Sequence, residues 1–184
     1  MREIEIKLKV KNLDELEKKL KEAGCIFSAP IKQNDVVYSS GSDTGARFTE
    51  AKEGHVAIRI RRENDIAEFT LKQQKSNEMD NMEYGTKVEN PEAIHKILEV
   101  LGWKPQLEVI KIRKKGKMGE YEICLDRVEQ LGEYVELEKI TDGNADPDEV
   151  RKELFEALKP FGLSEKDEET KGYDTLICQI KDKK

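Results

Sequence analysis

Apolar and polar residues alternate along much of this chain with a period of two, which is typical of β-strands that bury one face. The opening stretch, MREIEIKLKV, places four aliphatic residues on one face and four charged residues on the other. The aliphatic residues are Ile4, Ile6, Leu8 and Val10, and the charged ones are Glu3, Glu5, Lys7 and Lys9. Similar patterns predict strands at 2–10, 32–40, 56–63, 67–75, 82–89, 106–114, 119–128 and 132–140.

Three segments repeat apolar residues every three or four positions, which is the pattern of amphipathic helices. Each begins after a capping residue and ends at a glycine: from Asn12 to Gly24, from Asn90 to Gly102, and from Asp146 to Gly162. Residues 39–54, SSGSDTGARFTEAKEG, form the one long connection, which we expect to be a mobile loop or a surface hairpin. The acidic stretch 164–171 leads to a short C-terminal element at 172–180.

The helices restrict how the strands are arranged, because each apolar helix stripe needs an apolar surface to cover. If the apolar strand faces pointed inward, no such surface would remain for the helices. If they point outward, the charged faces must line an interior. The pattern therefore predicts an α+β fold: a closed eight-stranded antiparallel β-barrel with a polar lumen and helices packed outside. The alternative to a charged lumen is that the charged face of a given strand points to solvent, around an apolar-filled barrel or sandwich.

The charged faces separate by sign from strand to strand. The acids are Glu3, Glu5, Asp126, Glu136 and Glu138, and the bases are Lys7, Arg59, Arg61, Lys72, Lys111 and Arg113. Two carboxylates ~4 Å apart repel by about 4 kcal/mol at an effective dielectric constant of 20. A hard divalent cation, Mg²⁺ or Mn²⁺, would relieve the acids, and a polyphosphate would relieve the bases. We therefore expect a metal-bound polyphosphate as the ligand.

Composition excludes several other classes of protein. The chain has 184 residues, a net charge of -6 and only two histidines, which argues against a nucleic-acid groove, a zinc site or a Ser-His-Asp triad. No apolar run approaches the length of a membrane span. Cys25, Cys124 and Cys178 are widely spaced, so we expect reduced thiols in a cytoplasmic protein.

Glu3-x-Glu5-x-Lys7 resembles the ExExK signature of the CYTH superfamily, also called the triphosphate tunnel metalloenzymes. The resemblance continues through AIRIRRE, FTLKQ, IKIRK and CLDRVEQLGEYVELE, and implies a single CYTH-like domain over residues 1–184. The closing KGYDTLI is similar to the family's final segment, with Gly172 where serine is usual. NDVVY (34–38) fits the family only loosely and receives no role. Chain size and LGEYVELEK most resemble the class IV adenylyl cyclase branch.

The resemblance implies roles for the charged residues. Glu3, Glu5 and Glu136 would bind the metal, with Asp126 and Glu138 beside them as further acidic members of the metal site. The triphosphate would be bound by Lys7, Arg59, Arg61, Lys72, Lys111 and Arg113, with Lys87 as a further contact or a surface lysine. Lys7, Arg113 and Asp126 are the predicted catalytic groups.

Two reactions fit such a site, and the shared motif residues do not choose between them. A cyclase would join the ATP 3′-hydroxyl to the α-phosphorus and release pyrophosphate. A triphosphatase would direct water to the terminal phosphorus of an organic or inorganic triphosphate, such as tripolyphosphate, thiamine triphosphate or a nucleotide. A module that binds nucleotide or polyphosphate without turnover is the third hypothesis, although the complete acid set argues against it. The implied partners are Mg²⁺ or Mn²⁺ and ATP or another triphosphate, with no nucleic acid or membrane, and a homodimer fits a chain of this size.

Overall fold

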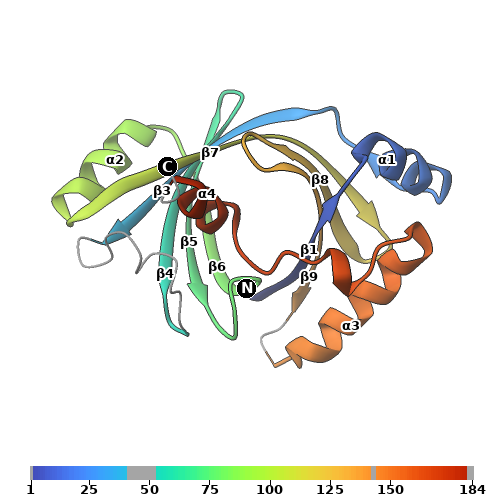
Figure 1. Ribbon diagram of the computed structural model, residues 1–184. Helices are drawn as coiled ribbons and strands as arrows, with labels where there is room; N and C mark the ends of the chain where they lie inside the picture. Colours follow the sequence, from blue (N-terminus) through green and yellow to red (C-terminus); the bar gives the residue numbers. More distant parts are fainter. Residues whose placement is uncertain (1, 41–52, 142–143, 182–184) are drawn as a thin grey trace.

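The computed structural model describes residues 2–40, 53–141 and 144–181 (Figure 1). These residues form one antiparallel sheet in the order β2-β7-β3-β4-β5-β6-β1-β9-β8, and a further pairing of β7 with β8 closes it. The strands are β1 (Arg2–Val10), β2 (Ile26–Phe27), β3 (Ile31–Ser40), β4 (Val56–Glu63), β5 (Ile66–Gln74), β6 (Asp80–Val88), β7 (Trp103–Met118), β8 (Tyr121–Val128) and β9 (Gly132–Thr141). With β2 attached outside the closure, the predicted eight-stranded barrel is confirmed.

Three helices cover the outer, apolar faces of the strands. They are α1 (Leu13–Glu22), α2 (Pro91–Val100) and α3 (Pro147–Leu158). The faces of β1, β8 and β9 that carry Ile6, Ile123 and Leu137 pack with α1 and α3, whereas Ile58 and Ile60 of β4 pack with Leu98 of α2. The prediction that apolar strand faces point outward beneath helices is therefore confirmed, and the opposite faces line the lumen.

The helix termini follow from the sequence. The side chains of Asn12, Asn90 and Asp146 accept hydrogen bonds from the backbone N–H groups of Glu15, Ala93 and Asp148, respectively. After α3 a short 3₁₀ turn, η2 (Lys159–Phe161), precedes Gly162, whose φ of 82° lies in the left-handed region that favours glycine. A second 3₁₀ turn, η3 (Glu165–Asp167), lies within the predicted acidic connector.

The C-terminal element is a helix, α4 (Tyr173–Lys181), which covers one end of the barrel. Tyr173 and Ile177 pack against Val37, Val109 and Val128, three residues on the lumen faces of their strands. This end of the lumen is thus filled by apolar side chains, and the charged residues lie deeper in the barrel. Figure 1 shows α4, in red, which packs against β7.

Most strand boundaries lie within two residues of the sequence-based expectation, and the largest differences concern β7 and β2. β7 runs over Trp103–Met118, longer at both ends than 106–114. Its first residues pair with the end of β3, and its C-terminal half pairs with β8 and with the two-residue β2. β2 is too short to leave a periodic signal and was not predicted. Residues 41–52 of the expected loop at 39–54 lie outside the described residues. Among the helices of the described segments, none has the length and apolar character to cross a membrane.

Candidate active site

The lumen contains a cavity of about 260 Å³ whose wall is largely charged. Its lining comes from every strand of the closed barrel and from the start of α4. Ten of the predicted site residues line it together: Glu3, Glu5, Lys7, Arg59, Arg61, Lys72, Lys111, Arg113, Glu136 and Glu138. The alternation of each strand explains this convergence, since residues two apart share the lumen face.

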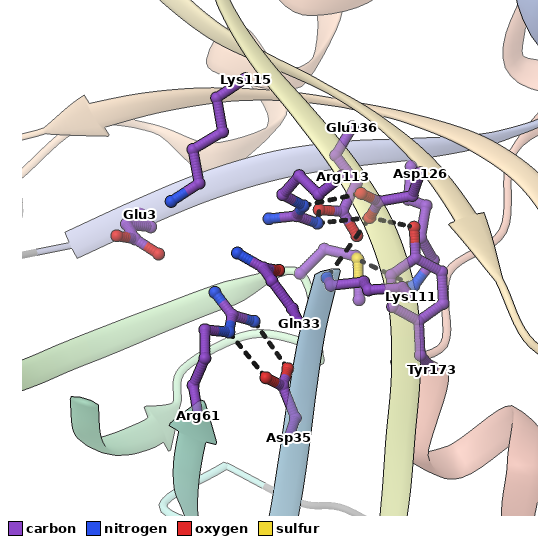
Figure 2. Close-up of polar contacts among 12 residues, drawn as sticks. Glu3, Gln33, Asp35, Arg61, Lys111, Arg113, Lys115, Asp126, Glu136 and Tyr173 are labelled. Carbon is purple, nitrogen blue, oxygen red and sulfur yellow. Dashed lines mark hydrogen bonds and ion pairs between the residues drawn. The ribbon is translucent and has the colours of Figure 1, made fainter. Parts of the chain in front are cut away.

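Arg113 is the centre of a buried network (Figure 2). Its guanidinium donates to both carboxylate oxygens of Asp126, with Nε to Oδ1 at 2.7 Å, and also to Glu136. Lys111 lies 3.3 Å from Asp126, and the Tyr173 hydroxyl donates to the same carboxylate at 3.0 Å. Burial and the cationic neighbour Arg113 reduce the pKa of Lys111 to about 8. The Arg113 guanidinium overcomes the effect of burial on Glu136 and holds the pKa of that carboxyl below its usual range.

Arg61 and Asp35 form a second buried pair on neighbouring strands. The guanidinium donates two hydrogen bonds to the carboxylate, at 2.7 and 2.6 Å, in the paired geometry that favours charge-assisted bonding. Arg59 lies beside it, 3.8 Å from Asp35 and 3.4 Å from Glu83. Although burial opposes ionisation, Arg61 lowers the pKa of Asp35. Two arginines on one strand therefore face the cavity with acidic partners at their sides.

A third group surrounds Lys72. Its ammonium lies 2.7 Å from Glu83 and 3.8 Å from Glu3. Despite burial, Lys72 lowers the pKa of Glu83 to about 2, whereas burial raises the pKa of Glu3 to about 8. The surroundings therefore favour the ionised form of Glu83, whereas burial favours the protonated form of Glu3.

Lys7 connects the opening strand to α4. Its ammonium donates to the Lys171 carbonyl and lies 4.5 Å from the centre of the Tyr173 ring, a cation–π contact. Lys111 approaches the same ring at 4.9 Å. Tyr173 thus stands between two predicted phosphate-binding lysines.

The acids on β1 and β9 make a region of unbalanced negative charge. Burial, followed by repulsion from Glu5 and Glu136, raises the pKa of Glu138 to about 7. Burial and the neighbouring Glu136 likewise raise the pKa of Glu5. These carboxylate oxygens are the ligands that Mg²⁺ and Mn²⁺ prefer, and a bound cation would remove the repulsion. The side chains therefore fit a hard divalent ion in donor type, although no three acidic, cysteine or histidine side chains of the described residues converge into a ready-made metal site.

Two predicted residues lie apart from the cavity wall. Asp126 is fully buried behind Arg113, where it binds Arg113, Lys111 and Tyr173. Lys87 is exposed on β6 opposite Glu68 and is absent from the cavity lining. Their predicted roles remain predictions, and the geometry suits Asp126 to orienting Arg113.

The structure also adds residues that were given no role. Asp35, Glu83, Lys115 and Tyr173 all line the cavity. Asp35 lies on the same strand face as Val37, two positions further along NDVVY, so strand alternation carried a signal for it. Tyr173 left no such signal, since its position depends on how α4 packs.

Comparison with known proteins assigns the chain to a family. The sequence profile of the CYTH domain matches residues 1–173. A Methanocaldococcus jannaschii protein named as a candidate adenylate cyclase is 32% identical over 166 residues, which are 89% of this chain and 91% of that protein. The chain therefore belongs to the CYTH family, an enzyme family that contains proteins named adenylate cyclase, and this membership implies a divalent metal.

Solved structures agree with the fold. A Pyrococcus horikoshii protein superposes with a TM-score of 0.80 at 26% identity, covering 97% of this chain and 99% of its own. A candidate adenylyl cyclase of Hippeastrum, described as having a dominant triphosphatase activity, superposes with a TM-score of 0.64 at 18% identity over 98% and 95% of the two chains. The latter likeness concerns the fold alone.

Proposed function

We propose that this protein is a metal-dependent enzyme that acts on triphosphates inside its barrel, most specifically a class IV adenylyl cyclase-like enzyme. In that reaction the 3′-hydroxyl of ATP attacks the α-phosphorus, the bond to the bridging oxygen breaks, and pyrophosphate leaves with cyclic AMP as the other product. The observation that carries the proposal is the convergence of lysines and arginines from β1, β4, β5 and β7 with carboxylates from β1 and β9 on one cavity. The name of the Methanocaldococcus relative supports the cyclase assignment.

The basic residues would hold the phosphate chain and stabilise the charge that develops on it. Arg59, Arg61 and Arg113 can each present two N–H groups to a phosphate, while Lys72 and Lys111 act as compact positive charges. All these side chains are already fixed by acidic partners, so little reorganisation is needed when substrate binds. Asp126 would keep Arg113 oriented toward the cavity from behind.

Glu3, Glu5, Glu136 and Glu138 would hold the metal, which we expect to be Mg²⁺ or Mn²⁺. The bound ion would polarise phosphoryl oxygens and neutralise part of the developing charge. We also propose a cytoplasmic location, which is consistent with the three free cysteines.

The alternative function is hydrolysis of the terminal phosphate by water. The same side chains would bind the triphosphate, and only the phosphorus that meets the nucleophile would differ. The triphosphatase activity described for the Hippeastrum protein supports keeping this candidate, because that protein shares the fold.

Product analysis separates these reactions. Purified protein would be incubated with ATP, and separately with tripolyphosphate, in Mg²⁺ and then in Mn²⁺, and the products followed by phosphorus NMR. Pyrophosphate with cyclic AMP is the expected result, and orthophosphate in its place would establish the triphosphatase. Binding of ATP without any product would overturn the enzyme assignment.

The variant Glu5→Gln tests the metal site within the same assay. Turnover should fall by at least a hundredfold, because a neutral amide replaces a carboxylate that faces the proposed metal. The thermal midpoint in metal-free buffer should stay the same or rise, since the change removes repulsion from Glu136. Glu149→Gln, on the exposed surface of α3, is the matched control and should retain full activity. Full activity of Glu5→Gln would contradict the metal assignment.

A further inference from the structure

Lys7 differs from the other cations of the predicted triphosphate site because it has no acidic partner. The other predicted triphosphate-binding residues that line the cavity each have a carboxylate oxygen within 4.0 Å: Arg59, Arg61, Lys72, Lys111 and Arg113. Lys7 is only 1% exposed, and no carboxylate of the described residues forms an ion pair with it. A buried ammonium without a carboxylate partner is costly, so its neutral contacts decide where it lies.

Most of those contacts come from the segment that leads into α4. The Lys7 ammonium donates to the Lys171 carbonyl and lies 4.5 Å from the centre of the Tyr173 ring. It also contacts the Met79 sulfur, at 4.0 Å. The Glu169 backbone N–H donates to the Lys7 carbonyl at 2.7 Å, so the same segment also holds the backbone of this lysine. Lys7 is therefore placed by the start of α4 and the residues before it, and not by an ion pair.

The start of α4 is itself fixed to the barrel wall. Glu78, in the connection between β5 and β6, accepts hydrogen bonds from the Gly172 backbone N–H at 2.6 Å and from the Thr175 hydroxyl at 2.9 Å. The Tyr173 hydroxyl donates to the fully buried Asp126 at 3.0 Å (Figure 2). These bonds hold the Tyr173 ring at the wall of the cavity, where it can orient a cation.

We propose that Tyr173 is a positioning residue for Lys7: its ring holds the ammonium where it can contact the triphosphate, so the start of α4 is part of the triphosphate site. The negative face of an aromatic ring attracts an ammonium without neutralising it. Lys7 therefore keeps its full charge for the phosphates, whereas an ion-paired lysine shares its charge with a carboxylate. This inference rests on the proposed function, because it assumes that the lumen holds the triphosphate.

The test measures tripolyphosphate binding by calorimetry in Mg²⁺, in a cycle of single and double variants. Tyr173→Leu, which removes the ring, should bind about tenfold more weakly than wild type, whereas Tyr173→Phe, which keeps the ring, should stay within about threefold. In the Lys7→Met background, Tyr173→Leu should change the affinity by less than about threefold, because no ammonium remains to be positioned. Tyr84→Leu makes the same change at an exposed position of β6 outside the cavity lining, and should bind as wild type does.

Thermal unfolding shows whether Tyr173→Leu remains folded. If it does not, replacement of Tyr173 by pentafluorophenylalanine gives the same test, because fluorine withdraws negative charge from the ring face with little change in size. This replacement should bind tripolyphosphate about tenfold more weakly than Tyr173→Phe. Equal affinities of these two variants would overturn the role of the ring.

The remaining outcomes separate this inference from the proposed function. An equal loss from Tyr173→Leu in the wild-type and Lys7→Met backgrounds would mean that Tyr173 does not act through Lys7, and would overturn the inference. Lys7→Met that binds tripolyphosphate as tightly as wild type would do the same while leaving the triphosphate site intact. Wild-type protein that does not bind tripolyphosphate would overturn the proposed function, and the role of Tyr173 with it.

Discussion

At the scale of single residues, the lumen is built from ion pairs that fold stability alone does not explain. Burying an ion pair costs several kcal/mol of desolvation, and well-packed apolar residues often serve stability equally well. Arg61 with Asp35, and Arg113 with Asp126, are nevertheless placed where water is largely excluded. Each pair holds a guanidinium rigidly at the cavity, which is useful for binding phosphate.

Substitutions at Arg61 can separate its contribution to fold stability from its contribution to phosphate binding. Arg61→Met should destabilise the fold by roughly 3 kcal/mol, because the buried Asp35 would lose both hydrogen bonds from Arg61 and keep only the longer contact with Arg59. Adding Asp35→Leu should restore most of that loss, while tripolyphosphate affinity stays low in both variants. Urea unfolding and calorimetry measure the two effects. A double variant that regained wild-type affinity would show that Arg61 does not bind phosphate.

At the level of secondary structure, each strand of the closed barrel has an outer apolar face and an inner face that lines the lumen. The helices cover outer faces of the barrel. Strand alternation predicted the eight barrel strands and, together with the apolar stripes of the helices, their outward apolar faces and ten cavity residues. Alternation carries no information about depth, so it could not place Asp126 behind Arg113 or Lys87 outside the cavity. Nor could it position α4, whose contacts with Val37 and Val109 depend on the closed barrel.

The anchoring of α4 can be measured through one isoleucine. Ile177→Ala should lower the free energy of unfolding by about 2–4 kcal/mol, because Ile177 is 1% exposed in the cluster that covers this end of the barrel. Ile97→Ala, on the half-exposed surface of α2, is the matched control and should change stability by less than about 1 kcal/mol. Equal effects in the two variants would mean that α4 is not packed as described.

At the scale of the whole molecule, the barrel encloses acids that prefer to be protonated. The pKa of Glu3 is raised to about 8 and that of Glu138 to about 7, from an ordinary value of 4.5. Between pH 4.5 and these raised pKa values, both carboxyl groups ionise in the unfolded chain but favour their protonated forms in the folded protein. The stability of the metal-free protein should therefore decrease as pH rises from about 5 to about 8.

A divalent ion should oppose this loss of stability. Since it binds the ionised carboxylates, Mg²⁺ should raise the thermal midpoint more at pH 8 than at pH 5.5. Glu3→Gln should flatten the pH dependence of the metal-free protein. Thermal unfolding across this pH range, with and without Mg²⁺, measures both effects. A metal-free midpoint that rose with pH would contradict the assigned pKa values.

Binding of a triphosphate by the lysines and arginines of the barrel interior can be measured by calorimetric titration with tripolyphosphate in Mg²⁺. Lys72 faces the cavity, whereas Lys104 is exposed on β7. We expect Lys72→Met to bind tripolyphosphate at least tenfold more weakly than wild type, and Lys104→Met to bind it with unchanged affinity. Equal affinities of wild type and Lys72→Met for tripolyphosphate would show that Lys72 does not bind the triphosphate.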